Sequence, residues 1–267
     1  MSTSRPTVAD LRDMKGERQL TNVYVDSVEE AAAAEAAGVD IITVQDTLMG
    51  DAYRDAAPSA FMVVGIEYGV SAVTTDDYLR SGFDALNAGG DAVWSAASLE
   101  TISRMRDEGI PVVGHVGLIP ARRTWTGGFR AVGKTARSAS EVWRATQALE
   151  SAGAFAAEIE VVPAAVASAI STRTSLVMIS MGSGPGCDAQ YLFSTDLLGT
   201  NSGHVPRHAK AYADLSAELA RLQQVRIAAF SSYVDEVATG AFPDESRLVP
   251  IDDVEFTNFM AELESEA

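Results

Sequence analysis

The feature that most constrains this chain is the alternation of short apolar runs with longer, Ala-rich stretches. Eight runs have the length and composition of β-strands, and most are apolar throughout. Continuous apolar runs are typical of parallel strands that are buried on both faces. The runs are LTNVYV (20–25), IITVQ (41–45), AFMVVG (60–65), DAVWS (91–95), PVVGHVG (111–117), FAAEIEVV (155–162), SLVMIS (175–180) and QYLFS (190–194).

Most segments between these runs carry helix start and stop signals, namely Ser or Thr followed by acidic residues at one end and Gly at the other. Examples are SVEEAAAAEAAG, TTDDYLRSGFDALNAGG, SLETISRMRDEG and SASEVWRATQALESAG. Strand–helix alternation implies right-handed crossovers and a parallel sheet. Eight such units favour a closed (β/α)₈ TIM barrel. An open, doubly wound sheet is the alternative, but no GxGxxG motif follows the first run.

One unit of the predicted barrel is shortened. Only DTLMGDAYRDAAPS (46–59) separates the second run from the third, which leaves room for a turn or two of helix. The last segment, DDVEFTNFMAELESEA (252–267), predicts an amphipathic acidic helix. Gly and Pro are spread along the chain, so we expect residues 1–267 to form one barrel domain with a C-terminal helix.

The formal net charge of −17 argues against binding to nucleic acid, which depends on Lys and Arg, and against binding to an anionic membrane surface. Cys187 is the only cysteine, so no intrachain disulfide can form, which fits a reducing compartment. The polar N-terminus lacks a signal-peptide pattern, and no apolar run has membrane-spanning length. We therefore expect a cytoplasmic protein that acts on a small-molecule substrate.

Catalytic groups of a (β/α)₈ barrel sit at the carboxyl ends of the strands and in the loops that follow them. This rule selects Asp46, Thr47, Glu67, Ser95, Ala96, His115, Glu158, Glu160, Ser183, Gly184 and Asp196.

Glu160 is the most informative of these, because a carboxylate in an apolar strand is costly unless it is paired. It is either a structural hydrogen-bond partner or a functional group, and burial raises its pKa toward the range of a general base. Glu158 has the same side-chain parity and is the alternative inward group. His115 is either a core histidine or a catalyst. Asp46 either caps a helix or binds Mg²⁺ together with Glu67.

Two segments could recognise an anion. The basic residues between 122 and 137 either lie in a solvated loop or hold a substrate carboxylate or phosphate; they are Arg122, Arg123, Arg130, Lys134 and Arg137. The Gly-rich turn SMGSGPGCD (180–188) could cradle an oxyanion with its backbone amides, although one such turn is a weak signal.

Long segments resemble motifs of the ketopantoate hydroxymethyltransferase family, in order and over most of the chain. GHVGLIPARRTWTGGFRAVGKT resembles its GH(I/L)GLTPQ…GGY(K)VQG(K/R)T stretch, and EIEVVPAAVASAI resembles LECVPxELAxxI. The segment SMGSGPGCDAQYLFSTDLLG is similar to GIGAGxxxDGQxLVxHDxLG, and VDIITVQDTLMG is similar to VGDSLGM. The segments HVPRHAKAYADL and GAFPDESRLV match the family's C-terminal motifs.

The resemblance implies a barrel of the phosphoenolpyruvate mutase and isocitrate lyase superfamily, whose members use a metal-bound enolate. In the parent reaction, α-ketoisovalerate loses a proton and attacks the methylene group of methylenetetrahydrofolate. Glu160 falls on the family's general base and His115 on the histidine of its GH motif. Asp46 falls on the first Mg²⁺-binding aspartate and Thr47 on a substrate-contacting serine. The family's large ring assemblies imply a homo-oligomer.

The chain departs from the family around the implied metal. The family's second metal-binding aspartate has no counterpart in VGIEYG (64–69), where Glu67 is the nearest acid. Trp94 replaces a lysine, Ser95 or Ala96 replaces a glutamate, and a long loop after the second strand is deleted. These losses count against Mg²⁺ and leave the use of tetrahydrofolate open.

We therefore predict a divergent enzyme of specialised metabolism that uses Glu160 as general acid or base. Its substrate would be an enolisable or α-keto-acid-like compound, with a carbon–carbon bond formed, cleaved or rearranged. The catalytic residues would be Glu160, His115 and Asp46, with Asp46 and Glu67 as metal ligands if a metal binds. We expect substrate contacts from Thr47, Trp94, Ser95, Ser183 and Gly184. The alternatives are a true 3-methyl-2-oxobutanoate hydroxymethyltransferase and a non-catalytic, ligand-binding paralogue.

Overall fold

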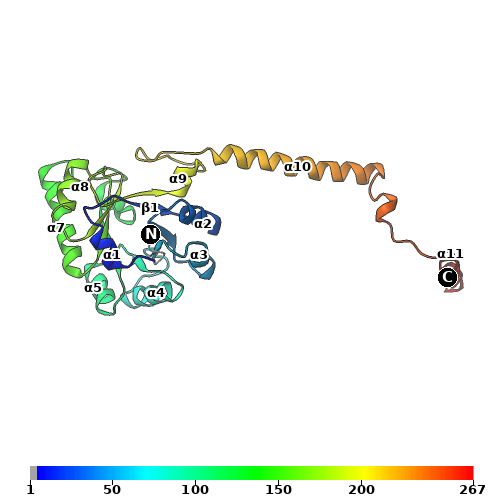
Figure 1. Ribbon diagram of the computed structural model, residues 1–267, viewed down its shortest axis with the longest axis horizontal. Helices are drawn as coiled ribbons and strands as arrows, with labels where there is room; N and C mark the ends of the chain where they lie inside the picture. The colour runs from blue at the N-terminus through cyan, green and yellow to red at the C-terminus, as the bar shows by residue number, and fades with distance from the viewer. Residues whose placement is uncertain (1–4, 267) are drawn as a thin grey trace. The chain divides into compact units, whose positions relative to one another are not determined.

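The eight predicted strands close into a parallel barrel, which confirms the predicted (β/α)₈ fold (Figure 1). The computed structural model describes residues 5–266, and side chains as far as residue 265. Each strand pairs with the next one along the chain, and the last pairs with the first. The strands are β1 (Leu20–Tyr24), β2 (Ile41–Gln45), β3 (Phe61–Gly65), β4 (Ala92–Trp94), β5 (Val112–Gly117), β6 (Ala156–Glu160), β7 (Val177–Met181) and β8 (Ala189–Phe193).

Helices cover the outside of the barrel (Figure 1), and the helices with predicted start signals have capped first turns. The side chains of Ser27, Thr74 and Ser98 accept hydrogen bonds from the first turns of α2, α4 and α5. The seventh helix begins earlier than SASEVW suggests, because Thr135 is its cap. The helices are α1 (Val8–Asp13), α2 (Val28–Ala36), α3 (Asp51–Ala56), α4 (Thr75–Asn87), α5 (Leu99–Asp107), α6 (Arg123–Thr126), α7 (Ala136–Ala152), α8 (Ala164–Ser171) and α9 (Ser194–Leu198).

Two separate apolar clusters hold the barrel together. One lies between strands and helices and includes Ile42, Val64 and Ile159. The other fills the barrel interior, where Leu11 of α1 packs with Leu20 and other inward side chains. Because side chains alternate along each strand, the inward set and the outward set are distinct. The interior is thus closed by apolar packing near the start of the strands, and the polar groups lie nearer their carboxyl ends.

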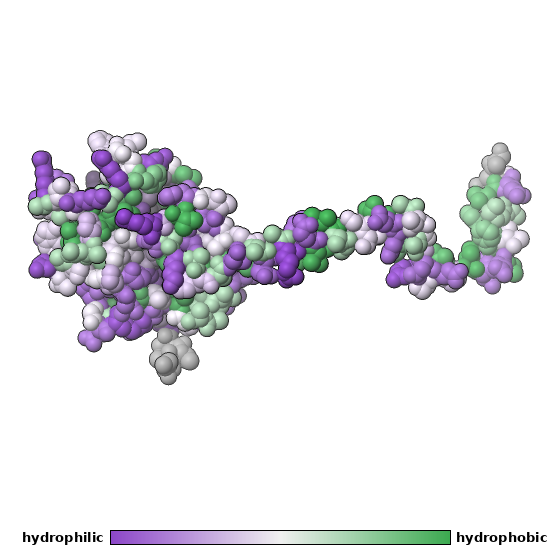
Figure 2. Space-filling model, turned by 90° about the horizontal axis from the view of Figure 1, so that it is seen from above, coloured by the Kyte–Doolittle hydropathy of each residue, from purple (hydrophilic) through white to green (hydrophobic). Residues whose placement is uncertain are grey.

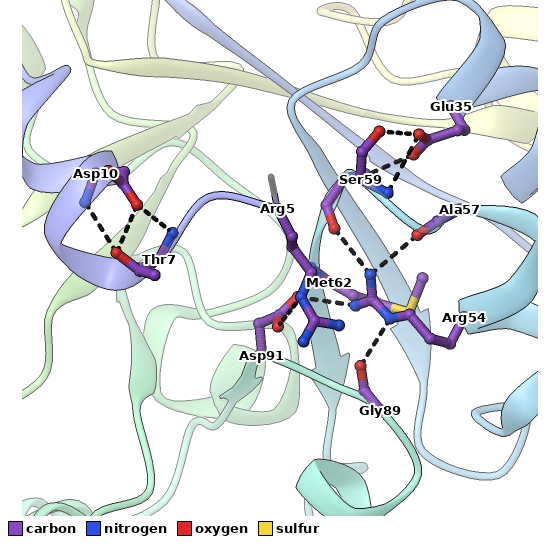
Figure 3. Close-up of polar contacts among 11 residues, drawn as sticks. Arg5, Thr7, Asp10, Glu35, Arg54, Ala57, Ser59, Met62, Gly89 and Asp91 are labelled. Atoms are coloured by element: carbon purple, nitrogen blue, oxygen red, sulfur yellow. Dashed lines mark hydrogen bonds and ion pairs between the residues drawn. The ribbon is translucent and has the colours of Figure 1, made fainter. Parts of the chain in front are cut away.

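The shortened unit after β2 contains a helix of only six residues, α3, and Arg54 ties this helix to the sheet (Figure 3). The guanidinium group of Arg54 donates to the carbonyl oxygens of Ala57, Ala60 and Gly89, and it pairs with Asp91 at 2.8 Å. The Asp91 carboxylate also accepts the backbone N–H of Met62. This half-buried network connects α3 with the start of β3 and of β4. It stabilises the unit in which most of the helix is missing.

A second unit follows the barrel and comprises Asp214–Ala267. It contains α10 (Leu215–Thr239) and α11 (Asp253–Glu266), and the latter confirms the predicted terminal helix. The pattern reading missed α10, which has 25 residues and no buried side chain. Apolar and hydrophilic residues are mixed along its helices in the space-filling view (Figure 2). That residues 1–267 form a single domain stays a prediction.

Among the described residues, no helix is both long enough and apolar enough to cross a membrane.

Candidate active site

A cavity of about 600 Å³ opens at the carboxyl ends of the barrel strands. Its size lies in the range of about 300–1,000 Å³ that is common for small-molecule sites. Residues from all eight strands line it, together with residues from the loops after β1, β3 and β5. This is the end of the barrel at which (β/α)₈ enzymes carry their chemistry.

Both glutamates of β6 point into this cavity. Glu158 and Glu160 alternate with Ile159, which packs outward against the helix layer. Both carboxyl-bearing residues are buried, with 4% and 8% of their surface exposed. The sequence leaves open which of the two glutamates points inward. Both do, because side chains two residues apart on a strand lie on the same face.

His115 lies between the two glutamates. The register of β5 and β6 pairs His115 with Glu158. The His115 Nδ1 atom is 3.5 Å from a Glu158 oxygen, and Nε2 is 3.1 Å from a Glu160 oxygen. These distances are in ion-pair range, but the ring N–H directions do not meet hydrogen-bond geometry. Among the described residues, neither ring nitrogen has a hydrogen-bond partner, and the same is true of Trp94 Nε1.

The electrostatics of this group favour a protonated Glu158. Burial raises the pKa of Glu158 to about 7; the His115 charge and the Trp94 indole lower it, and the Glu160 charge raises it. The pKa of Tyr191 is raised well above its ordinary value, first by burial and then by the Glu158 charge.

The backbone beside Glu160 is strained and braced. Val161 has a φ of 49°, which is rare for a β-branched residue. The Ser183 hydroxyl donates to the Ile159 carbonyl at 2.8 Å and accepts the Val162 N–H at 2.9 Å, so it bridges both sides of the strained residue. Such outliers persist where the surroundings over-determine them, and they cluster at functional sites. Ser183 thereby helps to fix the direction of the Glu160 side chain.

Gly117 allows β5 to approach the same turn. It has a φ of +86°, and a Cβ atom there would lie 2.4 Å from the Glu160 carbonyl oxygen. A side chain at this position would displace the strand end that carries Glu160.

The predicted site residues divide into two sets. Glu160, His115, Trp94 and Glu67 line the cavity together. The cavity lining does not include Asp46, Thr47, Ser95, Ser183 or Gly184.

The residues of the second set have other partners. Ser95 is fully buried, and its hydroxyl accepts the Ala97 N–H. The Gly184 carbonyl accepts hydrogen bonds from Ser180 and Gln190, so this part of the Gly-rich turn bonds within the protein. Substrate contact by these residues stays a prediction.

The donor set for a metal ion is thin. Asp46 accepts the backbone N–H of Thr47 at 2.8 Å, and Glu67 is exposed on the loop after β3. Within residues 5–266, no three His, Cys, Asp or Glu side chains are grouped as a metal site. Mg²⁺ requires near-octahedral oxygen ligation, and of the two predicted ligands Glu67 lines the cavity but Asp46 does not.

Pattern analysis missed several lining residues because they are not ionisable at neutral pH or lie early in a loop. They are Tyr24, Asp26, Thr43, Gln45, Tyr68, Met181, Tyr191 and Phe193. Half of them are the last inward positions of their strands. The two-residue period, counted back from each strand end, would have found Tyr24, Gln45, Met181 and Phe193.

The fold and the position of the cavity define a protein of the (β/α)₈-barrel enzyme class. The sequence model of the family described as ketopantoate hydroxymethyltransferase matches residues 49–245. A protein from Methylibium petroleiphilum named 3-methyl-2-oxobutanoate hydroxymethyltransferase 1 is 33% identical, with 95% of this chain and 92% of that protein covered. A 3-methyl-2-oxobutanoate hydroxymethyltransferase from Thermus thermophilus is 35% identical, with 91% and 99% covered. The chain belongs to the ketopantoate hydroxymethyltransferase family and is an enzyme of that transferase type.

Solved structures of lower identity share the fold. A phosphonopyruvate hydrolase, solved as a complex with oxalate and Mg²⁺, superposes with a TM-score of 0.51 at 13% identity and covers 97% of this chain and 98% of its own. A 3-dehydroquinate dehydratase from Geobacillus kaustophilus has a TM-score of 0.51 at 13% identity and covers 78% and 93%. These similarities support the barrel architecture and nothing finer.

Proposed function

We propose that this chain is a divergent ketopantoate hydroxymethyltransferase-like enzyme in which Glu160 removes a proton from carbon beside a carbonyl group. The observation that carries the proposal is the position of Glu160. It is buried at the end of β6, lines the cavity and lies 3.1 Å from His115. Glu160 is also the residue that matches the family's general base. The carbanion formed would then make, break or rearrange a carbon–carbon bond, and we place the enzyme in specialised metabolism.

The proton transfer can be written with the side chains present. A Glu160 oxygen takes the carbon-bound proton, and the C–H electron pair becomes the C=C bond of an enolate, whose oxygen gains the negative charge. Trp94 Nε1 is a buried donor that makes no hydrogen bond in the described structure, although the indole is near enough to Glu158 to lower the pKa of that carboxyl group. It can therefore donate to that oxygen, as oxyanion-hole groups do.

His115 completes the proton-transfer group. With Glu158 protonated, the Glu158 O–H faces Nδ1 of His115, which leaves the hydrogen of the neutral ring on Nε2, facing Glu160. In this tautomer His115 can donate toward the Glu160 carboxylate, orient it, and accept part of its charge. A rotation of the imidazole ring would bring both contacts into hydrogen-bond geometry, as often happens when a substrate binds.

A second candidate function is the parent reaction with 3-methyl-2-oxobutanoate and methylenetetrahydrofolate. The identity to proteins that carry this name, 33% and 35% over most of the chain, favours it. Trp94 in place of the family's lysine and the thin donor set for a metal count against it. A parent-reaction turnover of about 1 s⁻¹ or more, within the ordinary enzyme range, would establish the second candidate.

The proposal is tested by proton exchange, which needs no second substrate. A panel of enolisable ketones, aldehydes and keto acids is incubated with the enzyme in D₂O, and loss of the carbon-bound proton is followed by NMR. We expect at least one compound to exchange with the wild type and not with Glu160→Gln. Binding of panel compounds without exchange, unaltered by Glu160→Gln, would instead favour a non-catalytic ligand-binding protein.

A further inference from the structure

Apart from His115, no residue of the described cavity lining can carry a positive charge. Four carboxyl groups line the cavity, those of Asp26, Glu67, Glu158 and Glu160, and the described lining includes no Lys or Arg. Even with Glu158 protonated, three acids remain. An anionic ligand would therefore enter against repulsion, and like charges in a partly desolvated site disfavour binding strongly.

The basic loop of residues 122–137 does not compensate for these acids. Arg122 donates to the Ala96 carbonyl at 2.7 Å and lines a smaller, neighbouring cavity that shares His115 and Ile119 with the main one. Arg123, Arg130, Lys134 and Arg137 are exposed, and none of them lines the main cavity.

The apolar part of the wall is mainly aromatic. Tyr24, Tyr191 and Phe193 form a continuous surface, with ring centroids 5.0 Å apart for Tyr24 and Phe193 and 5.6 Å apart for Tyr191 and Phe193. Trp94 packs edge-on against His115 at 5.6 Å. Aromatic faces next to carboxylates attract organic cations through their quadrupoles as well as through charge.

A third observation concerns Trp94, whose buried Nε1 atom has no hydrogen-bond partner in the described structure. Buried polar groups are normally satisfied. A polar group of a ligand in the cavity would accept a hydrogen bond from Trp94 Nε1, whereas the ring nitrogens of His115 face the carboxyl groups of Glu158 and Glu160.

We propose that the substrate of this cavity is an organic cation, a protonated amine on an apolar or aromatic body. The inference rests on the proposed function in one respect, that the same molecule also carries the enolisable carbonyl. The ammonium group would lie near the mouth, between the exposed carboxylates of Asp26 and Glu67 and against Tyr24. The carbonyl end would lie deeper, toward Glu160 and Trp94.

Two probes with the same aromatic body and opposite charge test the proposal. They are 2-phenylethylamine and 3-phenylpropanoate, titrated by calorimetry into the full-length wild type near pH 7.5. We expect the amine to bind about tenfold or more tightly than the carboxylate, which corresponds to about 1.4 kcal/mol. The preference should shrink to within about threefold in Asp26→Asn/Glu67→Gln, because the charges that create it are gone. Glu108→Gln, which removes an exposed charge outside the cavity lining, should leave it unchanged.

Several results would overturn the proposal. Equal affinity, tighter binding of the carboxylate, or an amine preference that survives in the double variant would each exclude a cation site. So would failure of both probes to bind at millimolar concentration. The titrations are repeated with Mg²⁺ to test whether the acidic residues bind a metal ion instead. If Mg²⁺ reverses the preference toward the carboxylate, the acidic residues hold a metal and the proposal is wrong. Because binding is measured without turnover, these outcomes are independent of whether Glu160→Gln abolishes exchange.

Discussion

His115 Nδ1 lies 3.5 Å from the Glu158 carboxyl group, and strand register pairs the same two residues across β5 and β6. Glu158 precedes the segment IEVVP that resembles the family motif, so the second buried carboxyl group is a feature of this chain rather than of that motif. From its place behind His115 we expect it to act as a positioning residue for Glu160. The groups that face it are His115 on β5, Glu160 on β6, Trp94 on β4 and Tyr191 on β8.

The stability of the fold should depend on pH through Glu158. Burial raises the pKa of Glu158 from 4.5 to about 7, so the folded state binds more protons than the unfolded state between these values. Stability is therefore greatest below about pH 4.5 for this group and is lost as pH rises through 7, by on the order of 3 kcal/mol. Urea unfolding of wild type and Glu158→Gln at pH 5 and pH 8 checks this. The variant should gain relative to wild type at pH 8, and an equal difference at both pH values would contradict the assignment.

Arg54 should be required for stability at the shortened unit. Arg54→Met leaves three carbonyl groups and the Asp91 carboxylate without this donor, although Arg5 still pairs with Asp91 at 3.1 Å. Removing one partner of such a network costs about 3 kcal/mol. Arg106→Met, at a half-exposed arginine on α5 that pairs with the equally exposed Asp107, should cost less than about 1 kcal/mol. Similar losses for the two variants in urea unfolding would show that Arg54 is not a structural tie.

Ser183→Ala should impair catalysis more than binding. The variant loses the bridge between the Ile159 carbonyl and the Val162 N–H that braces Val161. We expect a stability loss of about 1–2 kcal/mol and a lower exchange rate, with ligand affinity changed little. Ser140→Ala removes a hydroxyl that bonds only within α7 and is the matched control. Wild-type exchange in a folded Ser183→Ala enzyme would remove Ser183 from the account.

Magnesium should bind weakly. Glu67 lines the cavity and Asp46 does not, and one carboxylate is a poor site for a strongly hydrated ion. Calorimetry should give a Kd weaker than about 100 µM. Protein sites with several carboxylate ligands bind divalent ions more tightly than this. Tighter binding that is lost in Asp46→Ala would restore a metal-dependent site.

How far the sequence predicts this structure differs between the barrel and the cavity. The strands could be predicted because continuous apolar runs that alternate with capped helices are typical of a parallel barrel. The strand β6, for example, lies within the predicted run FAAEIEVV. The side-chain directions of Asp46 and Thr47 could not be predicted. Both residues lie beyond the last residue of β2, where the alternation of a strand no longer holds. The helix α10 of the second unit was not predicted from the sequence. Its apolar residues are scattered around the helix and do not form one apolar face.

The central claim is that Glu160 is the proton acceptor and Glu158 supports it through His115. Exchange of a carbon-bound proton in D₂O, compared among wild type, Glu160→Gln and Glu158→Gln, tests this most directly, with circular dichroism to confirm folding. We expect Glu160→Gln to lower the exchange rate by about 10²–10⁴-fold, the usual contribution of a positioned base. Glu158→Gln should retain most of the activity near neutral pH, because an amide there mimics the protonated acid. Loss of exchange in Glu158→Gln alone, or full exchange in a folded Glu160→Gln enzyme, would contradict the claim.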